Sequence, residues 1–362
     1  MSIELIISLV KANIVLAVLL TNTILLIWFE RKVVAGMQSR VGPDRAGPFG
    51  ILQTLADAIK LLLKEQILPS KADRAMYLLA PLIALVPSFL IFMIIPLGPD
   101  ITVEWQNALY TIPLVGADLN VGVLYFLALS SIAVYSVVLA GWSSGSKYPL
   151  LGGVRASAQM ISYEAAMGLA LVPVILYSGS LSLVDIVNSQ SGNLSSSIPI
   201  LNTIVSFIPK WNIFPQFVAF GIFFIAAVAE VNRAPFDLVE AEQELVGGFH
   251  TEYSGFRFAM FFLAEYINMF NMCAITATFF LGGWLGPTFE GILPPIFSVI
   301  MPIIWLGVKT FLLLFVFVWI RATLPRLRYD QLMELGWKRM IPLSLVWLIL
   351  SAIVLGLREF GL

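Results

Sequence analysis

The sequence predicts an all-α polytopic membrane protein, with eight transmembrane helices and an amphipathic helix on the inner membrane surface. Apolar residues fill 59% of its positions and charged residues 12%, whereas soluble domains contain roughly 50% and 25%. Eight segments are long and apolar enough to cross a hydrocarbon core of about 30 Å. Because backbone polar groups cannot stay unpaired in lipid, these segments must be helices.

The eight segments are distributed over the whole chain, which we treat as a single membrane domain of residues 1–362. They are expected near residues 5–28, 76–98, 121–142, 157–178, 216–233, 257–283, 300–320 and 341–358. The first is too long for a signal peptide, has no small-residue cleavage site and continues directly into Glu30-Arg31-Lys32. It is therefore counted as a transmembrane helix.

Basic residues are concentrated in four of the segments between or beside the predicted spans. Residues 30–75, 143–156, 229–257 and 321–339 hold 17 of the 21 lysines and arginines. Since short cytoplasmic loops carry the excess of basic residues, these segments are assigned to the inner side. Both termini then face the outer side. The lysine-rich first loop and the chain length suit a bacterial plasma membrane.

Several kinds of chemistry are excluded by what the chain lacks. With one cysteine and one histidine, it cannot build a disulfide framework, a zinc site, a cysteine-ligated iron–sulfur cluster or a haem held by two histidines. It has no phosphate-binding glycine motif and no nucleophile elbow. The sequence therefore predicts no metal site, no covalently held cofactor and no redox centre in this chain, and nucleic acid is not expected as a partner.

The first inner loop, residues 30–75, combines a bend with an amphipathic helix. Gly-Pro pairs at 42–43 and 47–48 cannot continue a helix, so a bent, basic loop is expected over residues 40–50. Apolar residues then recur at helical spacing from Ile51 to Leu63, with polar residues between them. This helix should lie along the membrane surface, either as a plain anchor or as one wall of a ligand cavity.

Three carboxylates are predicted inside spans: Glu164, Glu230 and Glu265. An acid at such depth costs at least a few kcal/mol unless it is neutral, paired or beside a water-filled cavity. Lys309, also in mid-span, is a candidate counter-ion or proton carrier. The simpler alternative is that neighbours such as Ser162 and Tyr163 cap the acids locally.

The densest group of acids follows the fifth predicted span, where residues 230–245 read EVNRAPFDLVEAEQEL. This stretch leads into an acidic inner loop, residues 234–256, and holds Glu230, Asp237, Glu240, Glu242 and Glu244. In a helix, Asp237, Glu240 and Glu244 would share a face and repel, which raises the pKa of at least one. The usual meaning of such a run is a solvated face. Because the three deep acids approach the same side of the membrane, a proton route is the second interpretation.

Four long blocks resemble one protein family. They are ERKVVAGMQSRVGPDRAGPFGILQTLADAIKLLLKE (30–65), RASAQMISYE (155–164), AEVNRAPFDLVEAEQELVGGFHTEYSGFRFAMFFLAEYINM (229–269) and WIRATLPRLRYDQLMELGWKRMIPLSL (319–345). Together they resemble the H-type membrane subunit of respiratory complex I, which is the NADH dehydrogenase subunit one family, from the first span to the last.

The resemblance implies a subunit that performs no electron transfer itself. It would form the membrane end of a chamber for a quinone substrate, ubiquinone or menaquinone, and two peripheral-arm subunits would complete the headgroup site. NADH, FMN and the iron–sulfur clusters would belong to partner subunits. Other membrane-arm subunits and the lipid bilayer would be further partners. Quinone reduction would be coupled to proton pumping through charged residues of this subunit.

Matching positions imply two groups of functional residues. The chamber group is Glu30, Arg31, Arg40, Arg45, Asp57, Lys60, Phe236, Arg321, Arg326, Arg328 and Asp330, the last four from the basic inner loop, residues 321–340. The proton-path group is Glu164, Glu230, Asp237, Glu240, Glu242, Glu244 and Glu265. His250 stands where the family usually has asparagine; it could donate a proton near the quinone, or simply form local hydrogen bonds.

Two other functions remain open at this point. The related membrane-bound hydrogenases use an anchor subunit with overlapping sequence blocks, and a free-standing ion carrier would use the same carboxylates as its site. The complete first block and the long acidic block favour the complex I family over the hydrogenase anchor. Ion flux through this chain reconstituted alone would support the ion carrier, and none is expected.

Overall fold

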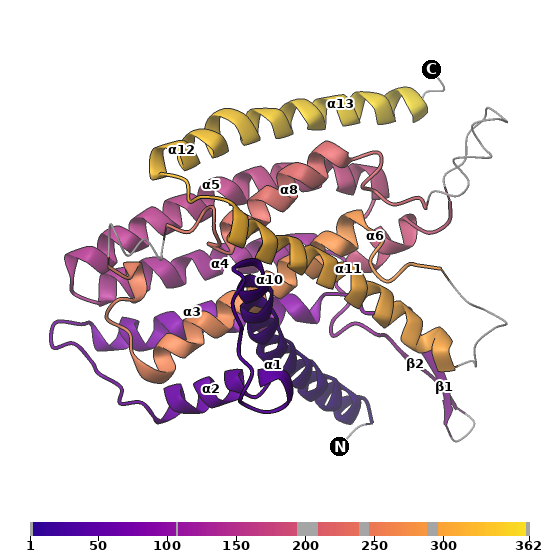
Figure 1. Ribbon diagram of the computed structural model, residues 1–362. Coiled ribbons are helices and arrows are strands. Elements are labelled where there is room, and N and C mark those ends of the chain that lie inside the picture. Colours follow the sequence, from indigo (N-terminus) through magenta and orange to yellow (C-terminus); the bar gives the residue numbers. More distant parts are fainter. Residues whose placement is uncertain (1–2, 106–107, 194–208, 239–245, 288–295, 360–362) are drawn as a thin grey trace.

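The computed structural model describes residues 3–105, 108–193, 209–238, 246–287 and 296–359, and they form a bundle of long helices (Figure 1). The helices in chain order are α1 (Ile3–Met37), α2 (Gln53–Leu63), α3 (Arg74–Met93), α4 (Gly122–Ser143), α5 (Lys147–Ser178), α6 (Leu183–Ser189), α8 (Phe217–Glu230), α10 (Gly255–Phe280), α11 (Ile296–Thr323), α12 (Tyr329–Glu334) and α13 (Ile341–Glu359). A π-helical turn, η3 (Leu335–Met340), joins α12 to α13, and short 3₁₀ turns η1 (Pro48–Gly50) and η2 (Gly248–His250) lie in loops.

Each of the eight expected spans coincides with one of these helices. Within the described residues, seven helices are long and apolar enough to cross a membrane, and the chain is a multi-pass membrane protein. The remaining expected span, residues 216–233, corresponds to α8, which has only 14 helical residues. The helical fold class is confirmed, while the count of eight spans is not.

The first inner loop folds largely as its sequence predicts. The chain bends between α1 and α2, and η1 with its flanking glycines makes the turn. Gly50 has φ +77°, and a Cβ there would lie 2.2 Å from the carbonyl oxygen of Pro43, so only glycine fits. The amphipathic helix is α2, whose Leu55, Ile59 and Leu62 are exposed as expected for a helix on a membrane surface.

Two inner loops are shorter than predicted, because the neighbouring helices α1 and α5 extend into them. The sequence predicts loops for the charged residues at these helix ends. α1 continues to Met37, so Glu30 and Arg31 lie on a helix. α5 begins at Lys147, so most of residues 143–156 is helical. Pro149 is tolerated in the first turn of a helix, and α5 packs closely on α4: a Cβ on Gly141 would lie 2.6 Å from the carbonyl oxygen of Pro149.

A short hairpin was not predicted. Strands β1 (Ile101–Trp105) and β2 (Ala108–Ile112) pair in antiparallel fashion between α3 and α4, with Ile101 opposite Ile112. It lies at the end of the bundle opposite to α2 (Figure 1). Apolar and polar residues alternate only in β1, over five positions, which is a weak signal beside long apolar runs.

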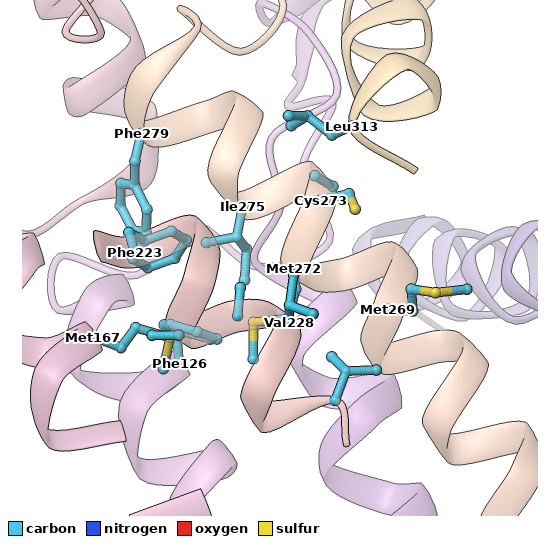
Figure 2. Close-up of a cluster of buried hydrophobic side chains, with 14 of the residues drawn as sticks. Phe126, Met167, Phe223, Val228, Met269, Met272, Cys273, Ile275, Phe279 and Leu313 are labelled. Carbon is cyan, nitrogen blue, oxygen red and sulfur yellow. The ribbon is translucent and has the colours of Figure 1, made fainter. Parts of the chain in front are cut away.

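The apolar core is centred on α10, the most enclosed of the long helices. Phe279 of α10 lies against Phe223 of α8, and Phe126 of α4 lies beside Met167 of α5, as Figure 2 shows. Met272 and Ile275 of α10 belong to the same buried cluster. Large apolar side chains on the outer faces of α1, α11 and α13 are exposed instead. This distribution suits helices that face lipid on one side and the bundle on the other.

Lys309 is not a counter-ion of the deep acids. Its ammonium group donates hydrogen bonds to the carbonyl oxygens of Leu281 (2.6 Å), Gly283 (3.0 Å) and Leu285, just beyond the end of α10. It also lies 4.3 Å from the ring of Trp211. The lysine thus satisfies carbonyl groups of the turn that follows α10, at the opposite end of the bundle from α2.

Replacing Lys309 by methionine should destabilise the protein by about 2–5 kcal/mol, because three carbonyl groups lose a charged donor. Thermal unfolding of the detergent-purified protein, followed by circular dichroism, measures the change. Lys338→Met is the matched control. Lys338 pairs with Glu334 on the exposed surface, and this pair should contribute less than about 1 kcal/mol to the stability. Equal stability of the two variants would contradict the proposal that Lys309 stabilises the turn after α10.

Candidate functional site

Four charged side chains from distant parts of the sequence meet at one point in the bundle. Glu30 comes from α1, Arg233 follows α8, Glu265 lies on α10 and Arg321 ends α11. Arg233 Nη1 lies 3.3 Å from Glu30 Oε1, and Arg233 Nε lies 2.7 Å from Glu265 Oε1. Arg321 pairs with the same oxygen of Glu30. We call these four residues the Arg233 cluster.

Arg233 is fixed from several directions. Its side chain and that of Glu30 are each only 6% exposed. The guanidinium group lies 4.5 Å from the ring centre of Tyr266, the residue after Glu265. Arginine suits this position because it stays charged and its planar fork can hold two carboxylates at once. Arg233, a permanent cation, therefore joins α1 and α10 to the turn that follows α8.

The turn that carries Arg233 is held by α5. Asn232 adopts a left-handed conformation with φ +54°, which asparagine tolerates better than most residues. The side-chain amide of Gln159 donates to the backbone oxygen of Ala229 (2.7 Å) and to Asn232 Oδ1 (3.2 Å). These hydrogen bonds fix the turn after α8 in a position from which Arg233 contacts both Glu30 and Glu265.

An open cavity of about 450 Å³ lies beside the cluster. It is lined by Glu30, Arg31, Val34, Gln38, Arg40, Tyr266, Arg321 and Ala322. The structure thus brings together four residues of the predicted chamber group, Glu30, Arg31, Arg40 and Arg321. We call this space the α1 cavity, since α1 and the residues just after it supply most of its wall.

Other members of the chamber group surround the α1 cavity less closely. Asp57 of α2 pairs with Arg31 at 2.6 Å and so ties the amphipathic helix to α1. Arg45 and Lys60 are exposed. Phe236 is buried and lies against Tyr163, with ring centres 5.2 Å apart. Those in the basic loop form pairs elsewhere: Arg326 with Asp237 at 3.1 Å, and Arg328 with Asp330 at 2.9 Å.

The deep acids have polar partners that come from a neighbouring helix. Glu164 accepts hydrogen bonds from Ser130 (3.1 Å) and Ser131 of α4. Glu230 is 7% exposed and interacts with both Ser130 and Glu164. The simpler alternative, local capping by Ser162 and Tyr163, is wrong, because Ser162 bonds to Ala158 and Trp337, and Tyr163 to Leu332.

A second, smaller cavity of about 70 Å³ connects two of the deep acids. Glu230, Glu265 and His250 line it, together with Ser136, Asn232 and Asn268. The space can hold a few water molecules, and its polar wall offers them hydrogen-bond partners. We call it the His250 cavity. It is separate from the α1 cavity, but Glu265 on its wall pairs with Arg233, which in turn pairs with Glu30 on the wall of the other.

The remaining acids of the path group lie at the start of the acidic loop. Asp237 is buried and paired with Arg326. Glu240, Glu242 and Glu244 lie outside the residues that the structure describes, so their expected crowding stays a prediction. Within the described residues, no group of histidine, cysteine and carboxylate side chains is placed to hold a metal ion.

Sequence reasoning missed three contributors to this site. Ser130 and Ser131 carry no signal in an apolar helix until their partner is known. Arg233 did stand out as the one base among five acids, but only the fold shows that it pairs with carboxylates 203 residues before it and on α10.

Comparison with known proteins gives the family. A model of the family described as NADH dehydrogenase matches residues 10–352. The chain belongs to this family. It is 47% identical to an H-type subunit of NADH-quinone oxidoreductase from Koribacter versatilis, over 98% of both chains. It is 51% identical to the equivalent protein of Syntrophobacter fumaroxidans, over 93% of this chain and 92% of the relative. It is 50% identical to that of Ralstonia nicotianae, over 96% and 91%.

Membership of the NADH dehydrogenase family agrees with the arrangement described above. Of the four blocks that carry the resemblance, the first supplies Glu30 to the Arg233 cluster, the third supplies Arg233 and Glu265, and the fourth supplies Arg321. The blocks are far apart in the sequence, yet they supply the side chains of one buried cluster.

Replacing Arg233 by glutamine should destabilise the protein by about 3–5 kcal/mol, because Glu30 and Glu265 lose a shared buried partner. The thermal unfolding midpoint of the purified assembly reports this loss. Arg328→Gln breaks a pair whose members are 75% and 63% exposed and should change stability by less than about 1 kcal/mol. If both variants have the same unfolding midpoint as the parent, the cluster does not stabilise the packing of α1, α10 and α11.

Proposed function

We propose that this chain is the membrane subunit of a proton-pumping NADH-quinone oxidoreductase, in which it binds quinone and couples quinone reduction to proton transfer. The observation that carries the proposal is the position of Arg233 between two cavities. One of its carboxylate partners, Glu30, lines the α1 cavity, and the other, Glu265, lines the His250 cavity. A change of charge in the first cavity therefore acts on an acid in the second.

The α1 cavity has the chemistry expected for the membrane side of a quinone chamber. Arg31 and Arg40 offer donors for the carbonyl oxygens of a quinone ring, and Val34, Ala322 and the ring of Tyr266 offer apolar contacts. The exposed apolar face of α2 would guide the isoprenoid tail in from the lipid. In this proposal Arg45, Asp57, Lys60, Phe236, Arg326, Arg328 and Asp330 line or support the chamber.

Partner subunits complete the reaction. The chain would hold the ubiquinone or menaquinone near peripheral-arm subunits that carry the NADH site, FMN and iron–sulfur clusters, and it would adjoin other membrane-arm subunits. It would lie in a bacterial plasma membrane with both termini on the outer side, which places α2 and the two cavities toward the cytoplasm. Electrons would reach the quinone from the partners, and the residues of this chain would respond to the resulting charge.

The coupling would work through shared ion pairs. Reduction of a quinone adds negative charge to the α1 cavity and attracts Arg321, Arg233 and Arg31. Any weakening of the bond between Arg233 and Glu265 makes that carboxylate a better proton acceptor. Glu265 would then take a proton from water in the His250 cavity. Glu230 and Glu164, which share Ser130, would continue the path into the bundle, and Asp237, Glu240, Glu242 and Glu244 would supply it from the rim.

Glu265→Gln and Glu230→Gln should each lower NADH-driven quinone reduction and proton pumping together, by at least roughly tenfold, since a positioned proton-transfer group contributes 10²–10⁴-fold. Both rates are measured in the same inverted membrane vesicles, with a pH-sensitive dye for pumping. Glu334→Gln is the control, because Glu334 is exposed and pairs only with Lys338 among the described residues. Full activity and full pumping in both deep variants would refute the coupling role.

Arg40→Gln and Asp57→Asn should raise the KM for quinone by at least roughly tenfold while the assembly still forms, since a hydrogen bond from a charged group contributes about 1.5–3 kcal/mol. Steady-state kinetics with a soluble short-chain quinone gives KM and kcat separately. Lys64→Gln, at the end of α2, tests for a general effect of charge. Loss of assembly instead of affinity would show that Arg40 and Asp57 are structural.

A further inference from the structure

His250, in the acidic loop, lines the His250 cavity together with the deep acids Glu230 and Glu265. It ends the short turn η2, just before α10. Three phenylalanine rings surround its imidazole, Phe249, Phe258 and Phe262, with ring centres 5.1–6.0 Å away. This apolar collar leaves the residue only partly exposed.

The imidazole is linked to acids of the interior and to an acid of the rim. It lines the His250 cavity with Glu230 and Glu265. The charge of Asp237 in the acidic loop also acts on the ring.

The imidazole is neutral at physiological pH. Its surroundings of aromatic rings lower the pKa of His250 to about 4, although the charge of Asp237 acts in the opposite direction. A neutral imidazole has one nitrogen that donates and one that accepts. Among the residues that the structure describes, no protein group hydrogen-bonds to either nitrogen, so both are available to water in the cavity.

We propose that His250 relays protons from Asp237 at the rim to Glu230 and Glu265 across the His250 cavity. The inference rests on the proposed function and adds a residue to its path. A proton that originates from Asp237 binds one imidazole nitrogen while the other nitrogen releases its own proton to a cavity water, which passes a proton on to a carboxylate. No electrons move, the ring ends neutral in its other tautomer, and rotation of the ring restores the starting form.

The relay explains how protons reach Glu230 and Glu265. Glu265 cannot receive a proton through Arg233, because a guanidinium group stays protonated. Glu230 is nearly buried and its nearest polar neighbours are Ser130 and Glu164. His250 lines this cavity and the charge of a loop acid acts on it, so it can connect the two groups.

The test uses the whole enzyme in inverted vesicles, with His250 replaced by asparagine and by alanine. Asparagine keeps a polar side chain of similar reach but cannot exchange a proton between two nitrogens. Both variants should lose at least roughly tenfold in quinone reduction and in pumping. In both, the solvent deuterium isotope effect on turnover should rise above that of the parent, since proton transfer becomes the slow step.

Phe258→Leu is the matched control, since it alters the collar around the imidazole without removing a proton-transfer group. It should keep the parent rate and the parent isotope effect. Parent activity in His250→Asn overturns the relay. A lower rate with an unchanged isotope effect, or the same loss in Phe258→Leu, assigns His250 to packing and also overturns it.

A parallel measurement on Glu265→Gln separates this inference from the proposed function. If Glu265→Gln is impaired and His250→Asn is not, only the relay fails, and the acids receive their protons by another route. If Glu265→Gln retains full reduction and pumping, the proposed coupling path fails and the relay fails with it.

Discussion

The contact on which the rest of the site depends is the double ion pair of Arg233 with Glu30 and Glu265. The side chains of Arg233 and Glu30 are each only 6% exposed, and that of Glu265 is 27% exposed. Removing such charged groups from water costs several kcal/mol per ion, and their mutual attraction compensates only when the geometry is good. That cost is offset only when α1, α10, α11 and the turn after α8 come to one point. The same requirement positions Glu30 on one cavity and Glu265 on the other, so the ion pairs that hold the helices also define the functional geometry.

Because its ion pairs share partners, the cluster can be sensitive to nearby charge as well as stable. Glu30 is held by both Arg233 and Arg321, and Arg233 is held by both Glu30 and Glu265. In the proposed coupling, a change of charge in the α1 cavity would redistribute the two arginines among their carboxylate partners. Interactions between charges are stronger in this partly dry region than in water, so the change would be felt at Glu265.

The sequence predicted the features that depend on local pattern. Apolar runs placed all the long helices, the Gly-Pro pairs placed the bend before α2, and the cost of charge in lipid singled out Glu164, Glu230 and Glu265. It failed where tertiary contacts decide. Charged residues at 30–32 and 147–155 were read as loop although they extend α1 and α5, and Lys309 was grouped with the acids because hydropathy does not tell which end of the bundle a side chain meets. The partners of Glu164 come from α4, which no spacing rule could reveal.

The two cavities need separate connections for charge and for protons. In the proposed mechanism Arg233 would transmit an electric field between them, but it cannot pass a proton because its guanidinium group does not deprotonate in proteins. It would therefore keep protons destined for the quinone apart from those destined for the acid path, a separation that a proton pump requires. A neutral imidazole has the opposite properties, since it carries no fixed charge and can take a proton at one nitrogen while releasing another. Arg233, which pairs with Glu265, and His250, which lines the same cavity as Glu265, would then supply two functions that one residue could not combine.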